Sequence, residues 1–259
     1  MKLIDAHIHL SDAEYAKLTD ELTKDAKEAN VVALVSNSVD FETSIGSLKL
    51  ADKYPRLVYP ALGIHPWNVN MLKENELEDT IKLISEQHRK NAVVAIGEIG
   101  LDYKYETLWE KQLMVFDKML RLAEKLGLPA IIHSRGTTAQ IVDKLPSYNL
   151  KGVLLHWFSN PISALFKAVD HGYFITEGPS AAYSNGIRDV VKKVPLTNLL
   201  TETDGPVTYY ESPYNGKLTK PSFIRTVVES VADVRGMAVV DVADKIAKNF
   251  EGFFNIKLC

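Results

Sequence analysis

The chain has 259 residues, of which 30 are Lys or Arg and 33 are Asp or Glu, so its formal net charge is −3. This balance gives no overall positive field for nucleic acid. The single cysteine, Cys259, excludes intramolecular disulfides and thiolate metal clusters. The N-terminus has no signal-peptide pattern, and no apolar segment reaches the roughly 20 residues that a membrane span needs. We therefore expect a cytoplasmic protein that is not bound to a membrane.

Eight short runs of apolar and β-branched residues recur along the chain, with helical patterns or loops between them. Most of these runs are apolar almost throughout, as parallel strands are when both faces of the sheet are covered. The predicted strands cover residues 3–9, 31–36, 57–63, 93–99, 129–133, 152–156, 173–176 and 199–203.

Apolar residues at helical spacing predict helices between these strands. The helices cover residues 74–90, 107–126, 137–145, 161–171, 186–194, 221–235 and 240–254, with a weaker pattern over 37–54. Ser11 and Glu14 fit a capping box, which predicts a helix start directly after the first strand. Gly127 and Gly172 stand where the glycine that follows a helix end belongs.

The alternation of eight strands with helices predicts an α/β fold of the (β/α)8 TIM-barrel type. An open doubly wound sheet would instead gather its ligand groups at one switch point between strands. Because barrels of about 250 residues form one domain, we expect a single domain over residues 1–259.

Five of the seven histidines fall at the carboxyl ends of predicted strands, and two carboxylates share this position. These residues are His7, His9, His65, His133, His156, Glu98 and Asp204. In a parallel barrel all these ends lie on one face, where enzymes of this architecture have their active sites. We therefore expect side chains that are far apart in the sequence to converge on one pocket.

This set of side chains predicts a site for two divalent metal ions. The two histidines of the first strand are two residues apart, so both point to the same side and can bind one ion. Glu98 or Asp204 can complete that site with a carboxylate. His133 and His156, on neighbouring strands, can bind a second ion, and Glu98 can bridge the two. Nitrogen and oxygen ligands suit Mg²⁺, Mn²⁺ and Zn²⁺ alike, so the identity of the metal stays open.

Six segments at these strand ends resemble the TatD family of metal-dependent hydrolases, within the amidohydrolase-like barrels. The segments are Asp5-Ala6-His7-Ile8-His9-Leu10, Gly63-Ile64-His65-Pro66, Gly97-Glu98-Ile99-Gly100-Leu101-Asp102-Tyr103, Ile132-His133-Ser134-Arg135, His156-Trp157-Phe158-Ser159 and Glu202-Thr203-Asp204. The resemblance covers essentially the whole chain. It implies a TIM barrel with a two-metal site that hydrolyses phosphodiester bonds, as a deoxyribonuclease does.

The resemblance also implies a role for each of these residues. The metal ligands would be His7, His9, Glu98, His133, His156 and Asp204, with Glu98 as the bridge. Asp204 would in addition orient or deprotonate the attacking water. His65 would contact a substrate phosphate or the leaving group, so the residues expected to take part in catalysis are Asp204, Glu98 and His65.

Loops after the strands carry aromatic and basic residues that suit a nucleic-acid substrate. Aromatic residues such as Tyr103 can stack unpaired bases, and Lys104 and Arg135 can neutralise phosphates. With a net charge of −3 such contacts must be local. This favours trimming of single-stranded DNA ends, of the 3′–5′ exonuclease type, over the binding of a long duplex.

Two other functions stay open at this point. The first is hydrolysis of a small amide, lactone or phosphoester on the same barrel. Enzymes of that kind often bridge their metals with a carbamylated lysine, where this chain has Glu98. The second is a catalytically silent barrel that serves only for binding. The sequence also leaves open the polarity of cleavage, endonuclease against exonuclease action, and the oligomeric state, a monomer included.

Overall fold

The computed structural model describes residues 1–258; the side chains of Glu106 and Thr107, and all of Cys259, lie outside the described part. Eight parallel strands form one sheet in the order in which they occur in the chain. They are β1 (Leu3–Ile8), β2 (Val31–Asn37), β3 (Val58–Leu62), β4 (Ala95–Asp102), β5 (Ala130–Arg135), β6 (Val153–Leu155), β7 (Phe174–Glu177) and β8 (Leu199–Thr201). All eight predicted strands are confirmed, with small differences at their ends.

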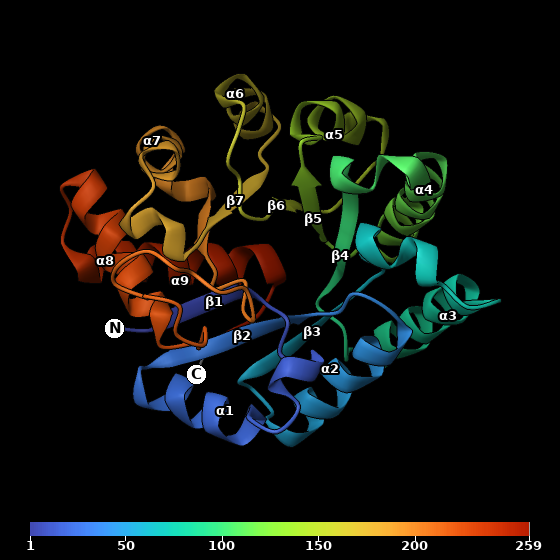
Figure 1. The fold of residues 1–259 in the computed structure, drawn as a ribbon, viewed down its shortest axis with the longest axis horizontal. Coiled ribbons are helices and arrows are strands. Elements are labelled where there is room, and N and C mark those ends of the chain that lie inside the picture. Colours follow the sequence, from blue (N-terminus) through green and yellow to red (C-terminus); the bar gives the residue numbers. More distant parts are fainter. Residues whose placement is uncertain (259) are drawn as a thin grey trace.

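The sheet curls until its last strand lies beside its first. Thr201 Oγ1 donates a hydrogen bond to the Ile4 carbonyl at 2.6 Å, and the Asp204 N–H donates to the His7 carbonyl at 2.9 Å. Figure 1 shows the resulting ring of strands, with the red C-terminal helices next to the blue first strand. The fold is therefore the predicted (β/α)8 TIM barrel.

Nine helices in the described part of the chain lie outside this ring (Figure 1). They are α1 (Thr19–Glu28), α2 (Phe41–Lys53), α3 (Glu76–His88), α4 (Trp109–Leu126), α5 (Thr138–Lys144), α6 (Ile162–Asp170), α7 (Asn185–Lys193), α8 (Phe223–Arg235) and α9 (Val239–Phe254). Gly127 and Gly172 follow α4 and α6 with φ of +62° and +74°, as predicted. None of the helices in the described part is long and apolar enough to cross a membrane.

The predicted helix start at Ser11 is wrong. Residues 13–15 form a single 3-10 turn, and the first α-helix begins only at Thr19. The side chain of Asp12, which precedes the turn, makes no capping hydrogen bond. Ser11 Oγ lies 3.0 Å from Ser47 Oγ of α2 instead. The hydroxyl group that a capping box would use is therefore engaged in a tertiary hydrogen bond.

Among the register irregularities of the sheet, two lie at predicted site residues. Between Asp5 and Ile8, β1 advances three residues while β2 advances two. Between Ile96 and Ile99, β4 advances three residues while β5 advances two. Such bulges turn a side chain away from the regular pleat. They lie at His7 and Glu98, whose side chains form the centre of the site described below.

Gly100 allows β4 and β5 to approach closely beside His133. Its φ is +154°, and a Cβ atom at this position would lie 2.0 Å from the His133 carbonyl oxygen. That oxygen belongs to the backbone of β5, so it cannot move aside without shifting His133. Only glycine fits this position.

We predict that Gly100→Ala lowers the free energy of unfolding by about 3 kcal/mol or more, because the methyl group overlaps backbone atoms. Gly127→Ala is the matched control, since its Cβ would meet no atom within 4 Å. The control should lose only about 1 kcal/mol for its left-handed backbone. Urea unfolding followed by circular dichroism measures both. Equal losses in the two variants would contradict the steric explanation.

Candidate metal centre

The seven strand-end residues singled out in the sequence come together at one end of the barrel. Three of them lie within strands, namely His7, Glu98 and His133. The other four follow the ends of strands, namely His9, His65, His156 and Asp204. All are buried except His133, which is partly exposed. The burial matters because donor atoms held away from water interact strongly with a bound charge.

The first donor cluster consists of His7, His9, Asp204 and the Oε2 atom of Glu98. His7 Nε2 lies 3.2 Å from Glu98 Oε2 and 3.4 Å from Asp204 Oδ1. His9 Nε2 lies 3.1 Å and 3.5 Å from the same two oxygens, and the two nitrogens are 3.2 Å apart. Four ligands about 2.0–2.1 Å from a tetrahedral metal ion are separated by about 3.3–3.4 Å. The measured separations match this value.

The second donor cluster consists of His133, His156 and the Oε1 atom of Glu98. This oxygen lies 2.8 Å from His156 Nε2 and 3.0 Å from His133 Nδ1. The two nitrogens are 3.3 Å apart. His65 Nε2 also lies 3.3 Å from this oxygen. Each oxygen of Glu98 therefore belongs to a different cluster of nitrogen donors.

The surroundings of Glu98 are those of a buried carboxylate that needs positive charge next to both of its oxygens. Its side chain is 1% exposed, and neither carboxylate oxygen has a hydrogen-bond partner. A buried carboxylate without hydrogen bonds is strongly destabilising. Imidazole nitrogens that crowd around a carboxylate without hydrogen-bonding to it are expected where their lone pairs point at a bound cation. The chemistry of the residues present thus fits the binding of divalent cations beside Glu98.

The electrostatics of the site also favour a bound positive charge. Burial disfavours the ionised form of Glu98, but the charges of the neighbouring imidazoles hold its pKa well below its usual range. Burial would lower the pKa of His9 and of His156, yet the adjoining carboxylates raise both well above the usual value. The carboxylates thus require positive charge, which protons or metal ions can supply. Protons and metal ions must therefore compete for these histidines.

For two of the histidines, a hydrogen bond at the far side of the ring fixes which nitrogen can bind a metal in the neutral ring. His133 Nε2 lies 2.9 Å from Asp102 Oδ2, and His9 Nδ1 lies 3.2 Å from the Asn37 carbonyl oxygen. Because an ionised carboxylate and a carbonyl can only accept, these nitrogens carry the proton. His133 Nδ1 and His9 Nε2 keep their lone pairs and point into the clusters. Such outer partners are typical of metal-binding histidines.

His65 has the opposite proton arrangement. The backbone N–H of Trp67 donates to His65 Nδ1 at 3.1 Å, so a neutral ring carries its proton on Nε2. Burial lowers the pKa of His65 to about 4, although the charge of Glu98 acts in the opposite direction. At neutral pH the Nε2 atom is therefore a hydrogen-bond donor. This separates His65 from the histidines whose lone pairs enter the clusters.

Two buried carboxylates behind the clusters received no role from the sequence. Asp102 accepts from His133, and Glu202 Oε2 lies 3.6 Å from His156 Nδ1. Both are completely buried. Each lies inside a segment that resembles the TatD family, so the segments contained the signal. Only the structure shows that these side chains lie behind the metal-facing histidines.

The predicted substrate residues lie on the same face, outside the two donor clusters. Tyr103 is 48% exposed and its ring packs 4.9 Å from that of Trp109. Lys104 is exposed, with Nζ 5.8 Å from the ring centre of Trp67. Arg135 is exposed at the end of β5. All three are therefore accessible to a ligand that reaches the clusters.

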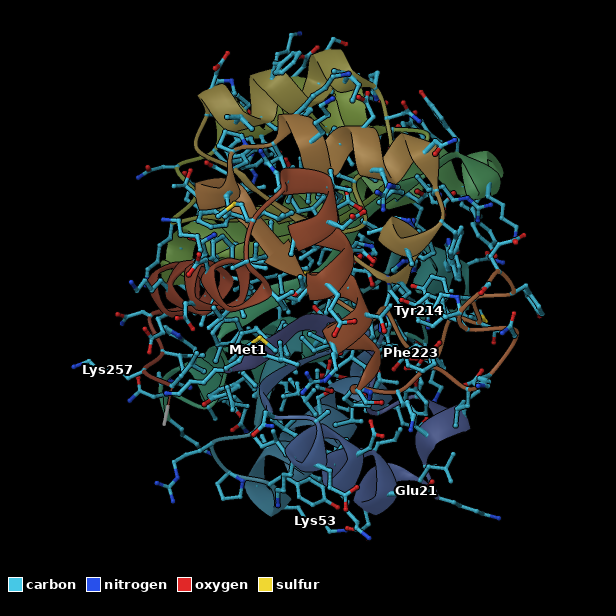
Figure 2. All side chains as sticks on the ribbon, turned by 90° about the vertical axis from the view of Figure 1, so that its left-hand side faces the viewer. Met1, Glu21, Lys53, Tyr214, Phe223 and Lys257 are labelled. Carbon is cyan, nitrogen blue, oxygen red and sulfur yellow. The ribbon has the colours of Figure 1, made fainter. Side chains whose placement is uncertain are left out.

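The long loop between β8 and α8 is fixed beside the site by aromatic contacts. The rings of Trp157 and Tyr209 are 5.7 Å apart, as are those of Tyr209 and Tyr214. Figure 2 shows Tyr214 next to Phe223, with 4.7 Å between the ring centres. Tyr209 Oη also donates to the Thr203 carbonyl at 2.8 Å. The segment that carries Asp204 is thus held in place by packing.

Comparisons with known proteins agree with this geometry. The family described as TatD related DNase matches residues 4–255. A human protein named deoxyribonuclease TATDN3 is 32% identical, with 95% of this chain and 92% of the human protein covered. An uncharacterized metal-dependent hydrolase of Methanocaldococcus jannaschii is 31% identical over 100% of this chain and 99% of its own length.

A solved structure extends the agreement to three dimensions. The TatD homologue YjjV of Escherichia coli superposes with a TM-score of 0.91 at 29% identity, over 98% of both chains. The chain belongs to the TatD-related DNase family of metal-dependent hydrolases.

Proposed function

We propose that this chain hydrolyses phosphodiester bonds of DNA with two divalent metal ions, held by the first and second donor clusters. The observation that carries the proposal is the division of Glu98 between the two clusters, one oxygen to each. Two cations on either side of one carboxylate form the arrangement used for in-line displacement at phosphorus. The name of the human relative, a deoxyribonuclease, supports DNA as the substrate.

The metal ligands in this proposal are His7, His9, Glu98, His133, His156 and Asp204. When bound, the ions would polarise a phosphoryl oxygen and lower the pKa of a water molecule. Asp204 accepts the proton of the attacking water, since its carboxylate lies at the edge of the first cluster and is 5% exposed. Burial would raise its pKa, but the neighbouring imidazoles of His9, His156 and His7 lower it.

His65 acts on the substrate in this proposal and not on the metal. Its Nε2–H donates to a non-bridging phosphate oxygen or to the leaving group. Tyr103, Lys104 and Arg135 contact neighbouring parts of the strand. The strand is single and is trimmed at its end, because local contacts of this kind suit a short flexible segment. The 3′–5′ direction is carried over from the expectation based on the sequence.

The number of bound ions tests the bridge. We predict that Glu98→Ala lowers the metal content from two ions per chain to one or none, because both clusters lose a ligand. Equilibrium dialysis followed by elemental analysis measures this. His171→Ala, which removes an exposed histidine far from the clusters, should keep both ions. Two ions bound to Glu98→Ala with the affinity of the unmodified chain would contradict the bridge.

The role of His65 has a different signature. We predict that His65→Ala keeps two ions but lowers kcat by about 10²-fold or more, because it loses a donor to the transition state. His133→Ala, the contrasting variant, should lose one ion. Metal content and kcat are measured on the same preparations. Loss of an ion from His65→Ala would make His65 a ligand and contradict its proton arrangement.

The substrate is tested with labelled DNA. In the presence of Mg²⁺, Mn²⁺ or Zn²⁺, we expect single-stranded DNA labelled at its 5′ end to be shortened from its 3′ end. The Asp204→Asn variant should reduce the rate by about 10²–10⁴-fold, which is the usual contribution of a general base. Lactones and small nitrophenyl phosphoesters form the comparison set. Turnover of these compounds without any cleavage of DNA would replace the nuclease assignment with the small-substrate alternative.

A further inference from the structure

We propose that Trp67, Tyr105 and Lys104 form a platform that binds one unpaired nucleobase and its adjoining phosphate beside the second donor cluster. The inference rests on the proposed function, because it identifies which part of a DNA strand is recognised and by what chemistry. We refer to these three side chains as the base platform.

The base platform is directly adjacent to the candidate metal centre. The Trp67 ring centre lies 4.9 Å from that of His65 and 6.0 Å from that of His133, in both cases edge to face. Despite these contacts 40% of Trp67 remains exposed. The exposed ring of Trp67 is thus close enough to the second cluster to contact the base of a nucleotide whose phosphate lies at that cluster.

The other two members extend this surface and give it charge. The Tyr105 ring lies 5.8 Å from that of Trp67 at an angle of 45°. The ammonium group of Lys104 lies 5.8 Å from the centre of each ring. Aromatic faces stack any of the four bases, and the lysine over the two rings supplies the point charge that a phosphate requires. The combination matches a nucleotide better than it matches a lactone or a small amide.

One buried carboxylate holds the platform and the metal site together. Asp102 Oδ2 accepts from both the indole N–H of Trp67 and His133 Nε2, and its Oδ1 accepts from the backbone N–H of Lys104 at 2.8 Å. Gln112 Nε2 donates to the Asp102 and Tyr105 carbonyls. Burial alone would raise the pKa of Asp102, but its hydrogen bonds lower it to about 2.

This anchoring makes the platform preorganised. The positions of the indole ring and of the Lys104 backbone are fixed relative to a metal-facing histidine before any ligand arrives. A base can lie on Trp67 only if the face that it presents is not covered by a neighbouring base. A base inside a duplex therefore does not fit, whereas a base at a frayed end, in a single strand or flipped out of a duplex does.

Binding measurements separate this inference from catalysis. Fluorescence anisotropy of a labelled tetrathymidylate, in an Asp204→Asn background supplied with Mn²⁺, follows binding without consumption of the strand. The comparison strand has the same phosphates but carries tetrahydrofuran in place of each nucleoside, so that it lacks bases. We expect the thymidylate strand to bind about 10-fold more tightly than the strand without bases.

Variants then assign this difference to the ring and to the charge. Trp67→Ala should lower thymidylate affinity about 10-fold, to that of the strand without bases. Trp67→Phe should keep most of the affinity, because it loses the same hydrogen bond to Asp102 but retains an aromatic ring. Lys104→Ala should weaken both strands by the same factor. Phe166→Ala, which removes an exposed ring on α6, is the control and should bind like the parent protein.

The outcomes distinguish the platform from the proposed function. Equal affinity of Trp67→Ala and the Phe166→Ala control for thymidylate, or equal binding of the two strands by the parent protein, would overturn the platform. If the unmodified chain cleaves DNA in that case, the nuclease proposal stands. If thymidylate binding depends on Trp67 but the unmodified chain cleaves no DNA, the platform stands and the nuclease proposal fails.

Discussion

The carboxylate of Glu98 is the constraint on which the rest of the site depends. It is almost completely buried, it lacks hydrogen-bond partners, and five imidazole nitrogens lie within 3.3 Å of its two oxygens. A charged group in this environment is stable only if positive charge stands close to it. The bulge in β4 brings Glu98 to this position, and Gly100 allows β5 to place His133 beside it.

The ring nitrogen that carries the proton differs among the histidines of the site, and this difference indicates their roles. Asp102 and the Asn37 carbonyl take the N–H groups of His133 and His9, so that the opposite nitrogens can bind a cation. Trp67 reverses this order at His65 by donating to it. In our proposal these contacts separate His133 and His9, as metal ligands, from His65, as a hydrogen-bond donor. Asp102 in addition accepts hydrogen bonds from His133, Trp67 and the Lys104 backbone, which in our proposal connects the metal site to the recognition of a substrate.

The sequence predicted the barrel and the convergence of its polar residues because both follow from simple periodicities. Buried parallel strands are continuous apolar runs, and residues at their carboxyl ends must meet on one face. The helix start at Ser11 failed because the hydroxyl group pairs with Ser47, a contact between residues far apart in the chain. The separate character of His65 rests on a backbone hydrogen bond, and the bulges at His7 and Glu98 are defined only by strand register. Neither leaves a signal in a single sequence.

The positions of the metal ions test the central claim most directly. Crystals of the chain grown with Mn²⁺ and measured at a wavelength with strong anomalous scattering would show them without reference to activity. The account predicts two peaks, one about 2.0–2.2 Å from each oxygen of Glu98, with the Nε2 atom of His65 outside coordinating distance of both. A single peak, or peaks that do not contact Glu98, would contradict it.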